Sequence, residues 1–222
     1  MPAISHVFFD LDGTLVDSAP GIRHSVHAAW KEVLPGEPFP LDRHIIGPPI
    51  GEVFRRMLPA PDESLIARLV VAFRRSYDTD GWHQSLLYPG VAEVVESLRS
   101  RGVICHVLTN KPRHATEKIL VLRGLLPLLD QVITPDSVEP GHPSKRAAAL
   151  HAGNALALDA GTAAIVGDSA DDLEAAEACG FLFAAALYGY GNLREVASAK
   201  GHVLLEQFSD LHQLFPQPAS HL

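Results

Sequence analysis

The chain has 222 residues, of which 47% are hydrophobic and 20% are charged, a composition typical of a soluble globular enzyme. This length suffices for one large domain or for a core with an inserted module. The formal net charge of −8 argues against a nucleic-acid polymer as a partner, because such binders carry a basic excess or a basic stripe. An acidic protein that handles an anionic substrate needs local positive charge, from a metal ion or from a placed Lys or Arg.

The composition also bears on where the protein works. Two cysteines do not make a disulfide framework, which favours a reducing compartment. No uncharged apolar run in the sequence reaches the roughly 18 residues that a membrane span requires. We therefore expect a cytoplasmic protein with no membrane partner. The sequence leaves open whether it is a monomer or a homodimer.

Short apolar runs alternate with segments of helical spacing along most of the chain. The runs predict buried strands at residues 4–9, 103–108, 131–134, 163–166 and 182–186. The helical segments between them are residues 91–101, 112–122, 144–152 and 170–179. A strand near 202–205 and a helix near 209–214 are expected to close the sheet edge. This alternation predicts an α/β fold, a doubly wound parallel sheet with helices on both faces.

One region breaks the alternation. Between residues 20 and 84 no convincing strand is found, and helical spacing occurs at residues 21–34, 50–58 and 62–77. This pattern indicates an all-helical module inserted after the first strand. We assign residues 1–16 and 86–222 to the Rossmann-like core and residues 17–85 to the inserted helical domain.

Polar side chains follow three of the predicted strands. Asp10 and Asp12 follow the first strand, and Thr109 and Asn110 follow the second. Asp168 follows the strand at residues 163–166. Ligands of doubly wound sheets bind at the carboxyl ends of the strands, so these groups are expected to converge in one crevice. A divalent cation among them explains why acids crowd there.

The chemistry of these residues points to phosphate transfer. Mg²⁺ takes oxygen ligands, and Asp10 and Asp168 are the best candidates. An ionised Asp10 held against a phosphate is a known kind of nucleophile, and Asp12 points the same way along the strand to exchange protons. Gly13 permits a sharp turn with backbone N–H groups facing the anion. The Thr109 hydroxyl and the Asn110 N–H are natural donors to phosphate oxygens.

Three stretches, "DLDGTLVDS", "LTNK" and "VGDSADDLEAAEACG", resemble in this order the first, second and fourth motifs of the haloacid dehalogenase superfamily. The resemblance covers nearly the whole chain and implies a Rossmann-like core with a helical cap. It implies Asp10 as nucleophile, Asp12 as general acid and base, and Thr109 as phosphate ligand. It also implies Mg²⁺ held by Asp10, the Asp12 backbone carbonyl and Asp168. Asp172 matches a later acid of the fourth motif, which orders a metal-bound water.

The third motif departs from the common Lys-Pro-x-Pro form, since the stretch here is "SVEPGHPSKRAAAL". Two residues compete for the role of the lysine that bridges nucleophile and phosphate. An alignment on Pro143 selects His142, whereas some phosphatases of the family use a lone Lys at the start of the next helix, which selects Lys145. We favour Lys145, because lysine keeps its charge where histidine titrates near neutrality.

Specificity is expected to lie in the helical domain. "IIGPPIGEVFRRML" places Gly47, Pro48 and Pro49 before a helix that carries Arg55 and Arg56, and it resembles the cap segment of the phosphoglycolate phosphatase and 5′-nucleotidase-like branch. Arg55 is our candidate for a second anionic group of the substrate, with a solvated surface arginine as the alternative.

Three further segments receive non-catalytic interpretations. Asp17 is interpreted as a helix-capping acid, and Asp171 as an acid at a helix N-terminus. The run "YGYG" at residues 188–191 is interpreted as a mobile loop, not as a nucleotide-binding element.

The leading hypothesis is a Mg²⁺-dependent phosphatase of small phosphorylated metabolites: phosphoglycolate, a nucleoside monophosphate or a sugar phosphate. Asp12 argues against a dehalogenase and against a phosphonate hydrolase of the same fold. A phosphosugar mutase is the main alternative among enzymes, because it keeps the core and differs in the cap. A non-catalytic binding protein is the alternative outside enzymes, and a missing core acid would favour it.

Overall fold

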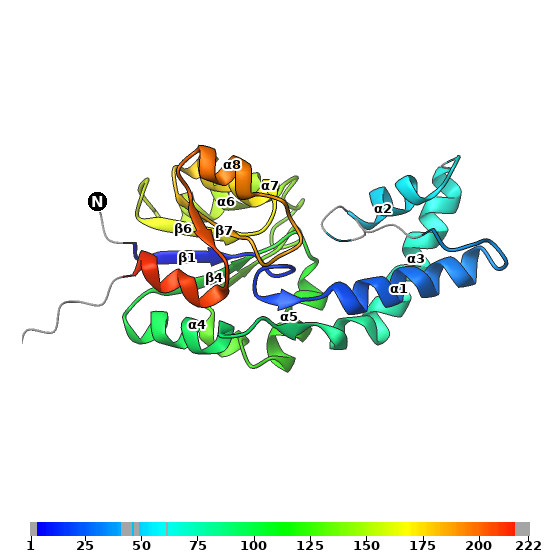
Figure 1. Ribbon diagram of the computed structural model, residues 1–222, viewed down its shortest axis with the longest axis horizontal. Helices are drawn as coiled ribbons and strands as arrows, with labels where there is room; N and C mark the ends of the chain where they lie inside the picture. Colours follow the sequence, from blue (N-terminus) through cyan, green and yellow to red (C-terminus); the bar gives the residue numbers. More distant parts are fainter. Residues whose placement is uncertain (1–3, 41–45, 47–48, 61, 216–222) are drawn as a thin grey trace, which may run out of the picture. The chain divides into compact units, whose positions relative to one another are not determined.

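The computed structural model describes residues 4–40, 46, 49–60 and 62–215. The chain divides into two compact units (Figure 1). The core unit comprises Met1–Val16 and Leu87–Leu222, and the helical unit comprises Asp17–Leu86.

The core unit is built on a six-stranded parallel sheet with the order β5-β4-β1-β6-β7-β8. The strands are β1 (His6–Phe9), β4 (Ile104–Leu108), β5 (Gln131–Ile133), β6 (Ala163–Gly167), β7 (Leu182–Ala186) and β8 (Val203–Leu205). After β1 the chain adds strands on one side and then, from β6, on the other. The strand order therefore reverses at β1, the switch point of a doubly wound fold, which confirms the predicted fold class.

Five α-helices connect the strands: α4 (Val91–Ser100), α5 (Arg113–Leu122), α6 (Lys145–Ala155), α7 (Ala170–Cys179) and α8 (Arg194–Ala199). Two 3₁₀ helices accompany them, η2 (Leu126–Leu128) and η3 (Phe208–Leu214). Figure 1 shows α6 and α7 on one face of the sheet and α4 on the other. Both faces are thus covered, which is why the buried residues of the central strands are mostly apolar and do not alternate with exposed polar residues; His106 in β4 is a buried polar exception.

Strand β1 shows how the sheet is anchored. Phe8 belongs to the cluster that packs under α6 and α7 with Ile165 and Phe183. Phe9 points to the opposite face, where its ring centroid lies 5.7 Å from that of Phe208 in η3. Burial of these rings on both sides holds the end of β1 in place, and the loop that carries the acids starts at this end.

Element boundaries differ slightly from those predicted. Pro112 was expected inside its helix, but its extended ψ of 147° makes it the cap residue, so α5 begins at Arg113. The helix predicted near residues 209–214 is the 3₁₀ helix η3, which begins one residue earlier, at Phe208. Helix α6 continues to Ala155, beyond the predicted end at residue 152.

The helical unit contains α1 (Ala19–Val33), α2 (Ile50–Met57), α3 (Glu63–Thr79) and the 3₁₀ helix η1 (Gly81–Gln84). Its own apolar core includes Val26, Trp30, Phe54 and Leu69. The chain passes between the units at β2 (Val16–Asp17) and β3 (Leu86–Leu87), which form a separate two-stranded sheet. Gly47 and Pro48 of the expected turn lie outside the described residues. No helix in the described ranges is long and apolar enough to cross a membrane.

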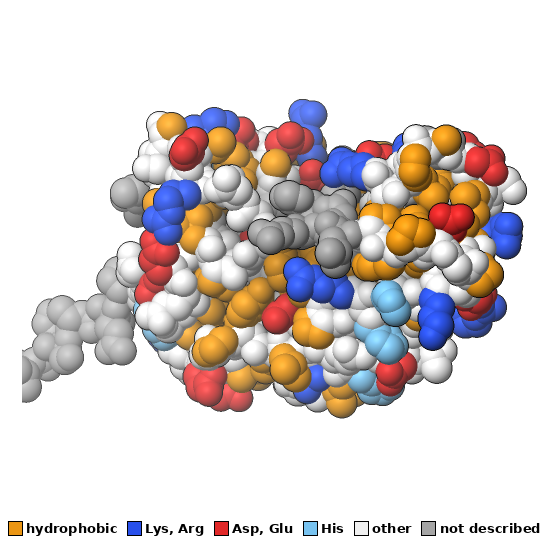
Figure 2. Space-filling view, turned by 45° about the vertical axis from the view of Figure 1, so that its right-hand side comes forward, with side chains coloured by type: hydrophobic (Ala, Val, Ile, Leu, Met, Phe, Trp, Pro, Cys, Tyr) orange, Lys and Arg blue, Asp and Glu red, His pale blue; other side chains and the backbone are white. Residues whose placement is uncertain are grey.

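The surface carries charges of both signs. On the face shown in Figure 2, Lys and Arg side chains of the described residues lie among Asp and Glu side chains and do not gather in one basic patch. Several are paired across short distances, such as Arg194 with Glu206 at 2.8 Å and Arg113 with Glu117 at 2.8 Å.

Candidate active site

The candidate site lies where three neighbouring strands end. Asp10 follows β1, Thr109 follows β4 and Asp168 follows β6. β1 pairs in parallel with both neighbours, and Phe9 is in register with Val107 and Val166. The three polar groups therefore leave the sheet at one edge, as the sequence predicted.

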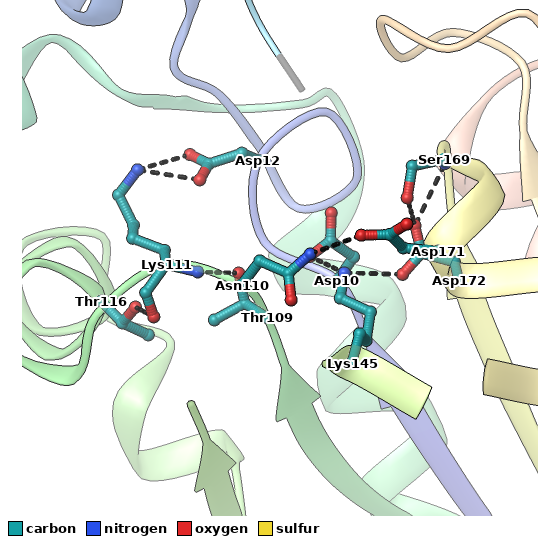
Figure 3. Close-up of polar contacts among 10 residues, drawn as sticks. All are labelled: Asp10, Asp12, Thr109, Asn110, Lys111, Thr116, Lys145, Ser169, Asp171 and Asp172. Carbon is teal, nitrogen blue, oxygen red and sulfur yellow. Dashed lines mark hydrogen bonds and ion pairs between the residues drawn. The ribbon is translucent and has the colours of Figure 1, made fainter. Parts of the chain in front are cut away.

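A buried lysine joins two of the acids. Lys145 Nζ lies 2.7 Å from Oδ1 of Asp10 and 2.7 Å from Oδ1 of Asp172 (Figure 3). Its side chain is 3% exposed, and those of Asp10 and Asp172 are 8% and 0% exposed. Lys145 is the first residue of α6, whose N-cap Ser144 accepts a hydrogen bond from the Ala147 N–H at 3.2 Å. The cap fixes where the helix starts and so where this ammonium is placed.

His142, the alternative to Lys145 as the lysine equivalent of the third motif, lies beside another histidine. The His142 ring packs edge-on against His151, with ring centroids 5.2 Å apart. Burial, together with repulsion from His151, lowers the pKa of His142 below its ordinary value, which disfavours a permanent positive charge there. The geometry thus supports Lys145 as the partner of Asp10.

Asp168 is held by backbone donors from a distant loop. Its Oδ2 accepts hydrogen bonds from the N–H groups of Tyr190 at 2.6 Å and Gly191 at 3.2 Å. A Cβ atom on Gly189 would lie 2.4 Å from Asp168 Cβ, and one on Gly191 would lie 1.7 Å from the Asp168 carbonyl oxygen. The "YGYG" segment was expected to be a mobile loop, and its mobility stays a prediction; in the structure its backbone packs closely against Asp168. The loop is a close-packed support of Asp168, and its glycines are the signal that sequence reasoning passed over.

Asp172 is fully engaged by the protein. Its Oδ2 accepts hydrogen bonds from the Ser169 backbone N–H at 3.1 Å and hydroxyl at 2.5 Å, while Oδ1 faces Lys145. A Cβ on Gly167 would lie 2.1 Å from Asp172 Cγ, so glycine is required at that position. The role of Asp172 in ordering a metal-bound water stays a prediction.

The acid cluster is unfavourable by itself. Asp10, Asp168 and Asp172 are all buried, and each offers a carboxylate oxygen within 4.8 Å of the others. Burial, reinforced by repulsion from Asp172 and Asp168 and opposed by the Lys145 ammonium, raises the pKa of Asp10 to about 8. Burial, with repulsion from Asp172, raises the pKa of Asp168 to about 6. Positive charge beyond that of Lys145 would relieve this repulsion, and hard oxygen donors in this number suit Mg²⁺.

A second lysine holds Asp12. Lys111 Nζ lies 3.0 Å from Oδ1 and 2.8 Å from Oδ2 of the Asp12 carboxylate. Figure 3 shows this pair apart from the pair formed by Lys145 and Asp172. Lys111 was present in the quoted "LTNK" motif but received no role, because the spacing gives no sign of which acid its side chain reaches.

The remaining predicted phosphate-binding residues have these surroundings. Thr109 is buried, and its Oγ1 accepts a hydrogen bond from the Lys111 N–H at 3.2 Å. Asn110 Nδ2 donates to Oδ2 of Asp171 at 2.8 Å, and Asp171 lies in the first turn of α7, as predicted. Gly13 has a φ of +88°, and a Cβ there would lie 2.3 Å from Asp168 Oδ2. A side chain at position 13 would therefore displace Asp168.

Two predicted residues belong to the helical unit. Arg55 donates hydrogen bonds to Glu52 at 2.9 Å and to Glu63 at 2.8 Å, so its guanidinium is engaged by carboxylates of its own unit. Its role in substrate binding stays a prediction. Asp17 Oδ1 accepts a hydrogen bond from the N–H of Ala19, the first residue of α1, at 3.0 Å, as expected of a capping acid.

Comparison with known proteins decides the family. A model of haloacid dehalogenase-like hydrolases matches residues 4–180. The chain belongs to the haloacid dehalogenase-like hydrolase family. It is 39% identical over 190 residues to a phosphoglycolate phosphatase of Cereibacter sphaeroides, a match that covers 83% of this chain and 85% of the relative. It is 35% identical over 188 residues to the tyrosine-protein kinase PtkA of Mycobacterium bovis, covering 83% of this chain and 62% of the relative.

A solved structure of this haloacid dehalogenase-like family, from Streptococcus pneumoniae, matches with a TM-score of 0.84 and 25% identity, covering 96% of this chain and 98% of its own. The family, its phosphoglycolate phosphatase-like branch and the enzyme class of phosphoric monoester hydrolase, all predicted from the motifs, are confirmed. The Rossmann-like core with an inserted helical unit agrees with the core and cap of that fold.

Proposed function

We propose that this haloacid dehalogenase-like hydrolase is a Mg²⁺-dependent phosphatase of small phosphorylated metabolites that forms an aspartyl-phosphate on Asp10. One observation carries the proposal: a buried Asp10 lies 2.7 Å from Lys145 and within 4.8 Å of two further buried carboxylates. Such a cluster favours a cation and a substrate that is itself anionic.

The residues fit Mg²⁺. Asp10, Asp168 and the backbone carbonyl of Asp12 would hold the ion, with Asp172 beside them. Among the described residues, Asp168 receives its two hydrogen bonds on Oδ2, so Oδ1 stays available as a ligand. When bound, the ion neutralises the carboxylates and polarises the phosphate.

The first chemical step transfers the phosphoryl group to the protein. An oxygen of Asp10 attacks phosphorus, and the bond from phosphorus to the substrate oxygen breaks. Lys145 and the Thr109 hydroxyl hold the oxygens of the transferring group, where negative charge develops. Asp12 donates a proton to the departing alcohol.

The second step hydrolyses the aspartyl-phosphate. Asp12, now a carboxylate, takes a proton from the attacking water, whose oxygen forms a bond to phosphorus. Inorganic phosphate leaves and the Asp10 carboxylate is regenerated. Asp12 recovers its proton for the next turnover, so the cycle consumes one water for each ester hydrolysed.

Phosphoglycolate is the first substrate to test, because a phosphoglycolate phosphatase is 39% identical to this chain over most of its length. Nucleoside monophosphates and sugar phosphates follow, since they share the monoester group. A phosphosugar mutase would return the phosphoryl group to a sugar, and a kinase would pass it to another acceptor. These rivals share the proposed core chemistry and differ in the acceptor.

The test is a panel of phosphorylated metabolites assayed for inorganic phosphate, with Mg²⁺ and with the metal removed by chelation. We expect phosphate release from one class of monoester only when Mg²⁺ is present. Phosphate that moves to a second sugar without release to water would favour the mutase. No turnover of any monoester by folded protein would contradict the proposal and favour a binding protein.

A further inference from the structure

Lys111 is a partly buried cation, and the chemistry proposed for Asp10 gives it no role. Its side chain is 8% exposed, and it faces both oxygens of Asp12, whose side chain is 22% exposed. The surface pair of Lys200 and Glu177 is 47% and 41% exposed. Solvent screens such an exposed pair and makes it nearly neutral for stability, whereas the partly buried pair of Lys111 and Asp12 is screened less and constrains both side chains.

The backbone of Lys111 is itself anchored. Its N–H donates to Thr109 Oγ1 at 3.2 Å, and its carbonyl oxygen accepts from Thr116 Oγ1 at 3.3 Å. Thr109 directly follows β4, and Thr116 lies in the first turns of α5. The base of the Lys111 side chain is thus tied to both elements that flank the second motif.

The Asp12 carboxylate depends on this lysine for its orientation. Asp12 lies in the loop after β1, where its backbone forms an isolated bridge with Val16. Within the described ranges, the hydrogen bonds that its carboxylate accepts come from Lys111. A carboxyl group that shuttles protons must stay within about 3 Å of the leaving oxygen and of the attacking water, so its rotamer matters for the rate.

We propose that Lys111 is a positioning residue that holds the Asp12 carboxyl group where it exchanges protons with the leaving alcohol and the attacking water. This inference rests on the proposed phosphatase function. Lys111 would act on the reaction through Asp12. Lys145, in contrast, would contact the transferring phosphoryl group directly.

The leaving group of the substrate distinguishes these two modes of action. An alkyl phosphate such as phosphoglycolate expels a basic alkoxide and needs Asp12 as an acid, whereas p-nitrophenyl phosphate expels a stable phenolate. kcat/KM reports the steps up to the aspartyl-phosphate, so the hydrolytic step does not obscure the comparison. In Lys111→Met we expect kcat/KM to fall about 100-fold for the alkyl ester and about 3-fold or less for the aryl ester. Equal losses for both esters, or no loss, would overturn the proposal.

A double-mutant cycle gives an independent readout. With the alkyl ester as substrate and kcat/KM as the readout, Lys111→Met in the Asp12→Asn background should cost no more than about 2-fold, although it costs about 100-fold in the wild type, because its partner is already disabled. A full additional loss would show that Lys111 acts on the substrate directly and would overturn the proposal. Lys111→Arg, which keeps a cationic donor, should recover at least about 10-fold of the loss on the alkyl ester.

Lys200→Met is the matched control, since it removes a lysine paired with one carboxylate at 2.5 Å on the surface. It should leave both rates unchanged. If Lys111→Met does not fold, Lys111→Ala, which also removes the donor to Asp12, carries the same comparison, and equal losses there also overturn the proposal. A wild-type protein without turnover would contradict the phosphatase itself, whereas an active wild type with equal losses in the variant contradicts only the role of Lys111.

Discussion

Lys145 Nζ lies 2.7 Å from Oδ1 of Asp10 although 135 residues separate them in the sequence. The same ammonium contacts Asp172 at 2.7 Å, so one cation links the ends of three elements, β1, α6 and α7. Burial opposes the charge on Lys145, but the two carboxylates outweigh it and raise its pKa above the ordinary value.

Removing this cation should disable the enzyme and weaken the fold. We predict that Lys145→Met lowers kcat by about 100-fold or more, because the transferring phosphoryl group loses a preorganised donor. The variant should also lose about 3 kcal/mol of unfolding free energy in the absence of metal, since it leaves two buried carboxylates without their cationic partner. Chemical denaturation and steady-state kinetics check both parts. An unchanged kcat would contradict the proposed role of Lys145 in phosphoryl transfer.

The metal-free protein should lose stability as the pH rises. Burial raises the pKa of Asp10 to about 8 in the folded state, far above its value of 3.8 in the unfolded chain. Between these two pH values the folded protein keeps a proton on Asp10 that the unfolded chain has released. The contribution of Asp10 to the unfolding free energy is therefore complete below about pH 4 and is lost as the pH rises toward 8. Mg²⁺ displaces this proton, so the rise in melting temperature on adding Mg²⁺ should be larger at pH 8.5 than at pH 5.5. An equal rise at both pH values would contradict a metal bound at Asp10.

The loop at residues 188–191 should control metal affinity. Gly191→Ala would place a Cβ 1.7 Å from the Asp168 carbonyl oxygen, which forces the loop away and removes backbone donors from the Asp168 carboxylate. We predict that the Kd for Mg²⁺, measured by calorimetry, rises about 10-fold or more. Gly51→Ala in α2 is the control, because the nearest atoms to its Cβ would be 3.9 Å away and helical alanine is favourable. Equal Mg²⁺ affinity in the two variants would refute the supporting role of the loop.

His106 should make the core sensitive to acid. Its ring is 1% exposed and lies against His6, with Nε2 and His6 Nδ1 3.0 Å apart. Burial, with repulsion from His6, lowers the pKa of His106 to about 4, below the unfolded value of 6.5. The neutral ring therefore contributes stability that is complete above about pH 6.5 and is lost as the pH falls toward 4, up to about 3 kcal/mol. His106→Leu should flatten the pH dependence of the unfolding free energy in this window relative to wild type, and an unaltered slope would contradict the assignment.

The sequence predicted most of the core, for a physical reason that individual elements illustrate. Strands such as β6 and helices such as α7 are buried on defined faces, and burial leaves apolar runs and spacing that can be read directly. Asp10, Thr109 and Asp168 could be brought together because parallel strands end at one edge of a sheet. Lys111 and the loop at residues 188–191 escaped prediction. Their roles depend on which distant group a side chain or a backbone N–H reaches, and that is settled by tertiary packing.

The central claim is that Asp10 carries the phosphoryl group during turnover. The most direct measurement starts with the enzyme turning over, in the presence of Mg²⁺, a monoester that it hydrolyses. The reaction is quenched in the steady state and reduced with borohydride, and the peptides are sequenced by mass spectrometry. An acyl phosphate is reduced by this treatment, so the account predicts conversion of Asp10 to homoserine, which is absent without substrate. An unmodified Asp10 under turnover that releases phosphate, or modification at another carboxylate, would contradict it.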